Sequence, residues 1–143
     1  FFKERHPGEI KYTILIVFFV FAFSITLSWG ISSSSLLGLI AIFGWGFGDM
    51  SASIIGTYLG KHHYKLDLLN KKTLEGSLAS FIAVFVTSMT LLFIYNYSPL
   101  VSIGLGLFFG VFGSLLELFS LRGLDTFTMP IGLLLASMIL YLI

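Results

Sequence analysis

The sequence predicts an all-α fold: a polytopic membrane bundle of about five transmembrane helices, forming one integral membrane domain over residues 1–143. Three observations lead to this prediction. The chain is 57% hydrophobic and only 10% charged, and a water-soluble domain of this size could not cover such a composition with polar groups. The apolar residues are gathered in five long segments. The basic residues are gathered in three of the polar segments around them.

The five apolar segments are close to the length of a membrane helix, about 20 residues for a hydrocarbon core of roughly 30 Å. In chain order they cover residues 12–29, 36–59, 78–95, 101–119 and 129–143. The last segment is short, so it must tilt little, begin earlier near Leu124, or continue beyond residue 143. Thr128 is suited to cap its first turn, where Pro130 is also tolerated.

The basic residues lie on alternate connections between these helices. Residues 31–35 and 96–99 carry no charge, whereas Lys3, Arg5 and Lys11 precede the first helix, Lys61, Lys65, Lys71 and Lys72 follow the second, and Arg122 follows the fourth. Five spans place all three basic segments on one side of the membrane, and the positive-inside rule makes that side cytoplasmic.

Charge and cysteine content exclude several classes of function. The formal net charge of +1 is too small to indicate a nucleic-acid partner. With no cysteine, the chain has no disulfide, thiolate metal site or cysteine nucleophile. The oligomeric state is left open between a monomer and a homo-oligomer.

Asp49 is the only charged residue between Tyr12 and Gly60, and it lies inside the second apolar segment. An ionised carboxylate in hydrocarbon costs at least ~2.5 kcal/mol, so its presence there indicates a functional role. Asp49, Ser53, Gly56 and Gly60 are four, three and four residues apart, which places them on one helical face. For the two glycines alone, a close helix-packing seam is the favoured interpretation.

Carboxylates and cations are predicted to gather at the cytoplasmic ends of the helices. The acids are Asp49, Glu75, Glu117 and Asp125, and the cations are Lys61, Lys72 and Arg122. Carboxylate oxygens suit Mg²⁺, and lysine and arginine neutralise phosphate oxygens, so the pattern indicates a site for Mg²⁺ and a polyphosphate. The alternative is a set of ordinary interfacial charges and ion pairs.

The connection over residues 60–77 adds a second pattern. Thr73 is expected to cap a helix that begins at the next residue. The free backbone N–H groups of that helix end, with the two lysines before Thr73, would form an anion site. His62 and His63 point apart on any regular backbone, so we expect solvated side chains rather than a metal-binding pair.

The segment ELFSLRGLDTFTMP, residues 117–130, adds a third pattern. Glu117 lies near the end of the fourth helix, an Arg-Gly turn follows, and Asp125 stands at the entry to the fifth helix. The two acids could share a metal or a phosphate with Asp49. The alternative is a helical hairpin in which Asp125 only caps the fifth helix.

Other motifs give no support to competing chemistry. The glycines at positions 104, 106, 110 and 113 lie within the fourth segment, where close helix packing explains them. GTYLGK, residues 56–61, has one residue too few for a Walker loop and lacks its Ser or Thr. The sequence contains neither HExxH nor GxSxG, so zinc proteolysis and serine hydrolysis are unsupported.

Taken in order, three blocks of the sequence resemble a known family. GDMSASIIGTYLGK (48–61), KKTLEGSLASF (71–81) and ELFSLRGLDTFTMP (117–130) are similar to blocks of the CTP-dependent membrane lipid-alcohol kinases. That family includes phytol kinase, dolichol kinase and diacylglycerol kinase, and it is distantly related to phosphatidate cytidylyltransferase. Its members transfer the terminal phosphate of a nucleotide, typically CTP, to the hydroxyl of a hydrophobic alcohol at the membrane surface.

Together with the charge pattern, the resemblance implies a nucleotide and Mg²⁺ site built from all three blocks. The nucleotide would be bound by Lys61, Lys72, Thr73, Glu75, Gly76, Ser77, Arg122 and Gly123, and Mg²⁺ by Asp49, Glu117 and Asp125. Lys72 would act on the phosphate, and either Asp49 or Asp125 would be the base. Gly48 and Pro130 also match the blocks.

The chain departs from the family pattern in two respects. Thr126 stands where the family usually has Asn, and it still offers an oxygen. Fewer helices precede the first block than in the family, so we expect that part of the lipid-binding region is missing or dispensable.

Two other functions compete with a lipid kinase. A cytidylyltransferase would join CTP to a lipid phosphate at nearly the same site, although the short third block and the KKTLEGS loop favour the kinase. A small ion or solute transporter would use Asp49 as a coupling carboxylate. It would require polar residues that continue to the far side of the membrane, and the sequence gives no such pathway.

Overall fold

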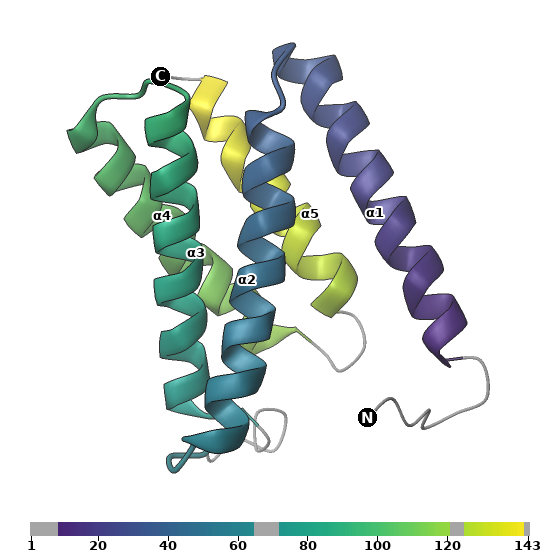
Figure 1. The fold of residues 1–143 in the computed structure, drawn as a ribbon, viewed down its shortest axis with the longest axis vertical. Coiled ribbons are helices and arrows are strands. Elements are labelled where there is room, and N and C mark those ends of the chain that lie inside the picture. The colour runs from purple at the N-terminus through teal and green to yellow at the C-terminus, as the bar shows by residue number, and fades with distance from the viewer. Residues whose placement is uncertain (1–8, 65–71, 121–124, 142–143) are drawn as a thin grey trace.

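The structure is a computed structural model that describes residues 9–64, 72–120 and 125–141. Its helices are α1 (Glu9–Ser32), α2 (Leu36–Tyr58), α3 (Leu74–Ile94), α4 (Pro99–Phe119) and α5 (Asp125–Ser137), and the 3₁₀ turn η1 (Met138–Tyr141) continues α5 (Figure 1). Within the described ranges the only β-structure is one isolated bridge. The predicted all-α fold is confirmed.

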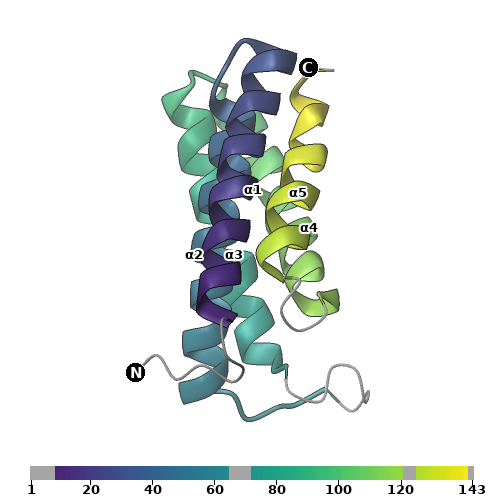
Figure 2. The ribbon, with the colours of Figure 1, turned by 90° about the vertical axis from the view of Figure 1, so that its right-hand side faces the viewer.

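The helices run alternately up and down, so that their ends form two distinct layers. The α1–α2 and α3–α4 connections and the end of η1 lie together at the top of Figure 1, which we call the uncharged end. The start of α1, the end of α2, the start of α3, the end of α4 and the start of α5 lie toward the bottom, the charged end (Figure 2). Helix α2 contacts each of the other helices and is the centre of the bundle.

Four helices, α1 to α4, are long and apolar enough to cross a membrane, and α5 lies in a shorter apolar stretch, Thr126–Leu140. Their outer surfaces carry large apolar side chains. Leu15, Phe18 and Leu100 are 65%, 69% and 83% exposed. Soluble monomers rarely expose contiguous apolar surface of this extent, so the chain is a multi-pass membrane protein.

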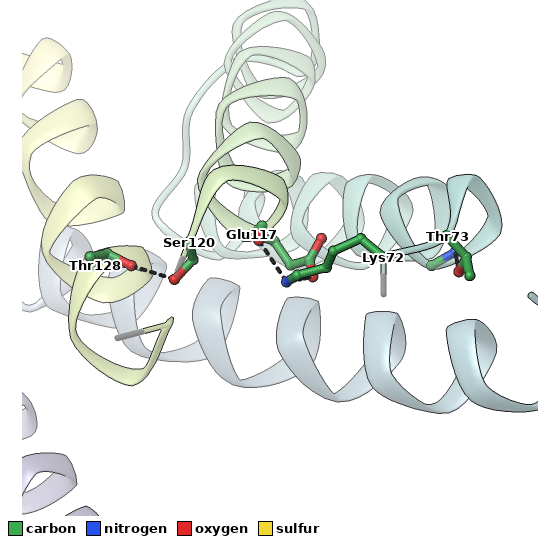
Figure 3. Close-up of polar contacts among 6 residues, drawn as sticks. Lys72, Thr73, Glu117, Ser120 and Thr128 are labelled. Carbon is green, nitrogen blue, oxygen red and sulfur yellow. Dashed lines mark hydrogen bonds and ion pairs between the residues drawn. The ribbon is translucent and has the colours of Figure 1, made fainter. Parts of the chain in front are cut away.

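The fifth helix begins earlier than residue 129. It starts at Asp125, in agreement with the alternative that placed its start near Leu124. The prediction that Thr128 caps it is therefore wrong, because Thr128 lies inside the helix. The Thr128 hydroxyl is hydrogen-bonded to the Ser120 hydroxyl at 2.9 Å and ties α5 to the end of α4 (Figure 3). Pro130 also lies beyond the first turn, where its missing N–H removes one helical hydrogen bond.

The third helix begins at Leu74, so it extends further than the apolar run that starts at residue 78. Thr73 is its N-cap, in extended backbone, and the Thr73 hydroxyl accepts a hydrogen bond from the Gly76 N–H at 3.2 Å. The predicted cap is confirmed. This cap sets the residue at which α3 begins, next to the end of α2.

Glycines on α4 let it pack closely against α3. A Cβ atom at Gly106 would lie 3.2 Å from the Phe85 ring, one at Gly110 would lie 3.0 Å from Phe85 Cβ, and one at Gly113 would lie 3.0 Å from Val84. The predicted packing role is confirmed at these positions. Gly104 differs, because nothing lies within 4 Å of the Cβ position there.

Candidate functional site

A pocket of about 470 Å³ opens at the charged end, where the second half of α2, the first turns of α3 and the last turn of α4 meet. Its lining is unusually polar for this apolar chain. The lining residues are Asp49, Ala52, Ser53, Gly56, Thr57, Gly60, His63, Lys72, Thr73, Gly76, Ser77 and Glu117. The pocket therefore collects residues from all three sequence blocks.

One face of α2 forms the floor of this pocket. Asp49, Ser53, Gly56 and Gly60 all line it, so the face predicted from their spacing is confirmed, although α2 ends just before Gly60. The glycines also have the packing role expected for them. A Cβ at Gly56 would lie 3.0 Å from Thr73 Oγ1, so the missing side chain lets α2 approach the start of α3.

A short antiparallel pairing holds the chain before α3 in place. His63 and Thr73 form a β-bridge, the Leu74 N–H donates to the His62 carbonyl at 3.0 Å, and the Tyr64 N–H donates to the Lys72 carbonyl at 3.3 Å. The backbone of Lys72 is thus fixed beside the pocket, while its long side chain can turn.

The predicted anion site at the start of α3 is only partly present. Two N–H groups expected to be free are engaged, since Leu74 donates to the His62 carbonyl and Gly76 donates to the Thr73 hydroxyl. Among the described residues, the positive end of the helix dipole and the ammonium of Lys72 can still attract an anion.

The Lys72 ammonium makes the central polar contact of the pocket. It donates to Glu117 Oε1, forming an ion pair, and to the Glu117 main-chain carbonyl at 2.8 Å (Figure 3). Glu117 is only 4% exposed, and its other carboxylate oxygen, Oε2, is buried with no hydrogen-bond partner in the described part of the chain. A buried carboxylate with one cationic partner and one unpaired oxygen can accept a further cation or donor.

Glu75 lies near this pocket but does not line it. Its carboxylate accepts from His62 instead, with Nδ1 at 2.6 Å from Oε1 and the backbone N–H at 3.3 Å from Oε2. The His62 side chain is 77% exposed, as a solvated residue should be, yet it clamps the connection onto the first turn of α3. Its neighbour His63 faces the other way and lines the pocket, which the sequence interpretation did not anticipate.

The remaining predicted site residues lie outside the pocket lining or outside the described part of the chain. Lys61 is exposed and does not line the pocket. Asp125 is the first residue of α5, but its side chain, like all of Arg122 and Gly123, lies outside the described residues. Among the side chains that are described, no three His, Asp or Glu residues gather closely enough to hold a metal ion by themselves.

The pocket nevertheless offers oxygen ligands that suit Mg²⁺. Asp49 and Glu117 supply carboxylates, and Ser77 supplies a buried hydroxyl with no hydrogen-bond partner within the described ranges. Mg²⁺ is commonly held by one or two carboxylates together with substrate phosphates and water. The carboxylates of Asp49 and Glu117, the latter with Oε2 unpaired within the described ranges, therefore fit this ion.

No protein-family model matches the chain, and comparisons with the curated proteins and with the solved structures give no match. The blocks 48–61, 71–81 and 117–130 are separate in sequence, and each contributes to the pocket at the charged end, the third through Glu117.

Proposed function

We propose that this chain is a membrane kinase that transfers the terminal phosphate of a nucleoside triphosphate, with CTP as the first candidate, to the hydroxyl of a lipid alcohol. The observation that carries the proposal is the convergence of the three kinase-like blocks on one polar pocket at the charged end. The positive-inside rule makes that end cytoplasmic, where nucleotides are present.

The pocket residues divide the work of phosphoryl transfer, which needs positioning and charge neutralisation more than covalent help. Asp49 and Glu117 would hold Mg²⁺, which when bound draws charge from the phosphate oxygens. Lys72 would neutralise the oxygens of the transferred phosphate. Of the two acids that the sequence offers as the base, Asp49 lines the pocket and takes that role in this proposal.

The reaction balances without any other reactant. The alcohol oxygen forms a bond to the terminal phosphorus, and the bond from that phosphorus to the bridging oxygen breaks. The nucleoside diphosphate leaves, and the alcohol proton passes to Asp49. The alcohol would approach laterally from the bilayer, because its hydrocarbon chain stays in the membrane while its hydroxyl reaches the polar end of the bundle.

The direct test is phosphorylation of lipid alcohols by the purified protein. The protein is incubated with Mg²⁺, labelled CTP or ATP, and a panel of phytol, polyprenol and diacylglycerol. We expect a labelled lipid phosphate and the nucleoside diphosphate. No lipid phosphate with any member of the panel would overturn the proposal.

The same products separate the kinase from a cytidylyltransferase acting on a lipid phosphate. Release of pyrophosphate and formation of a cytidine diphosphate lipid would replace the kinase with the transferase, since the two reactions break different bonds of CTP.

A transporter is distinguished by flux across vesicles. The described charged residues lie toward the charged end, whereas the uncharged end has only hydroxyl and amide groups at its connections, such as Ser33, Ser98 and Asn96. If Asp49→Asn left phosphorylation intact but abolished solute flux, the transporter would be the better account.

A further inference from the structure

The Glu117 carboxylate is occupied by a cation of the protein itself, the Lys72 ammonium. Glu117 lies in the last turn of α4, so its carbonyl is among the last four of the helix, which have no partner within it. The helix dipole also places partial negative charge there. The Lys72 ammonium binds both this carbonyl, at 2.8 Å, and the carboxylate of the same residue.

The coordination of the Glu117 carboxylate is incomplete in a way that favours a metal ion. Glu117 Oε2 is buried and has no partner among the described residues, and Asp49 lines the same pocket. One ammonium therefore leaves one oxygen of the Glu117 carboxylate desolvated and without a donor in the described part of the chain, which is unfavourable. A divalent cation takes several oxygen ligands at once and can bind this oxygen as well.

The Lys72 side chain can move away from Glu117 while its backbone stays beside the pocket. Its backbone is held by the Tyr64 N–H and by the neighbouring Thr73, which caps α3. Its side chain has a flexible four-carbon stem and is 26% exposed, so it has room to turn. Once released from Glu117, it stands beside the positive end of α3, where a phosphate would be favoured.

We propose that Lys72 and a divalent cation exchange at Glu117: the ammonium occupies the carboxylate in the ligand-free protein, and cation binding releases it to bind phosphate. This deepens the proposed function, because it rests on the Mg²⁺ of that site. It also makes cation and phosphate binding mutually favourable, since each ligand raises the affinity for the other by the same factor.

Chemical labelling of lysines in the wild-type protein tests the exchange without nucleotide or lipid. The amines are acetylated with acetic anhydride in MgCl₂ or in KCl of equal ionic strength, and each lysine is quantified by mass spectrometry. We expect Mg²⁺ to raise Lys72 labelling by about fivefold or more, the lower end of usual coupling between sites. Lys61, which is exposed and outside the pocket, is the internal control and should not change.

A second measurement uses Mn²⁺ alone, followed by electron paramagnetic resonance. Lys72→Met should bind Mn²⁺ about fivefold or more tightly, because the competing ammonium is gone. The matched change Lys61→Met should alter Mn²⁺ affinity by less than about twofold, since an exposed charge is screened. Glu117→Gln should abolish the Mg²⁺ effect on Lys72 labelling.

The outcomes separate this inference from the kinase proposal. Lys72 labelling that is unchanged or lowered by Mg²⁺, in a protein that phosphorylates lipid, would overturn the exchange and keep the kinase. Labelling that rises with Mg²⁺ in a protein that phosphorylates no lipid alcohol would keep the exchange and overturn the kinase.

Discussion

At the scale of single residues, the stability of the charged end depends on how Glu117 is neutralised. Its side chain is 5% exposed, and the Lys72 ammonium is its partner, with a side chain that is 26% exposed. Breaking a buried ion pair by removing one partner costs about 3–5 kcal/mol, and the partial exposure of Lys72 lowers that figure. Removing only one partner of the Lys72–Glu117 pair is therefore expected to lower the stability of the protein.

We predict that Lys72→Met lowers the free energy of unfolding by about 2 kcal/mol in cation-free buffer, because Glu117 is left buried and unpaired. The double variant Lys72→Met/Glu117→Met should recover most of this loss, since no buried charge remains. Unfolding in detergent mixtures, followed by circular dichroism, gives both values. Equal destabilisation of the single and double variants would show that the pair does not act as a unit.

Asp49 carries the second prediction at this scale. Asp49→Asn keeps the size and polarity of the side chain but removes the base, so we expect phosphoryl transfer to fall by about 100-fold or more. The matched control is Ser51→Ala on the same helix, because Ser51 does not line the pocket. Initial rates of lipid phosphorylation measure the effect. Comparable rates for the wild type and Asp49→Asn would remove Asp49 from the proposed chemistry.

At the scale of elements, the approach of α2 to the start of α3 sets the shape of the pocket. A Cβ at Gly60 would lie 2.2 Å from the Gly56 carbonyl and 2.6 Å from Thr73 Cγ2, distances that require the backbone to move. A side chain at this point would therefore clash both with the last turn of α2 and with Thr73 at the start of α3.

We predict that Gly60→Ala destabilises the protein by about 1–3 kcal/mol, the usual cost of overpacking, and also lowers activity by displacing Lys72 from the pocket. Gly46→Ala is the matched control. It lies on the same α2 with nothing within 4 Å of the Cβ position, and alanine favours a helix. Thermal unfolding and initial rates test the pair. A tolerated Gly60→Ala would mean that α2 and α3 are not held at this contact.

Helix starts could be predicted from the sequence where a local signal marks them, and contacts between helices could not. The start of α3 followed from Thr73, because a capping residue is a local signal, and the polar face of α2 followed from helical period. The start of α5 agrees with only one of the alternatives, and the Thr128 cap was wrong, because Thr128 bonds to Ser120 at the end of α4 instead of capping its own helix. The contact between Lys72 and Glu117, 45 residues apart, depends on how α3 and α4 cross, which no local pattern encodes.

At the scale of the whole molecule, alternate charging of the connections predicted that the polar groups would share one end of the bundle. This could be predicted because charged residues are costly in hydrocarbon and each span reverses the chain. The pocket then forms where three helices bring their polar ends together. Glycines on α2 and α4 determine how closely these ends approach each other. The spacing of the glycines indicates close packing, but it does not say which helix each one packs against.

The orientation of the molecule gives the last prediction. The chain has no cysteine, so single cysteines report on sidedness without any background. Lys61→Cys lies at the charged end, and Ser33→Cys and Ser98→Cys lie at the uncharged end, all at exposed positions. With a membrane-impermeant maleimide on intact cells, we expect Ser33→Cys and Ser98→Cys to react and Lys61→Cys to react only after the membrane is opened. Reactivity of all three from outside would exclude α2 and α3 as membrane spans, and the reverse pattern would place the pocket on the side that has no nucleotides.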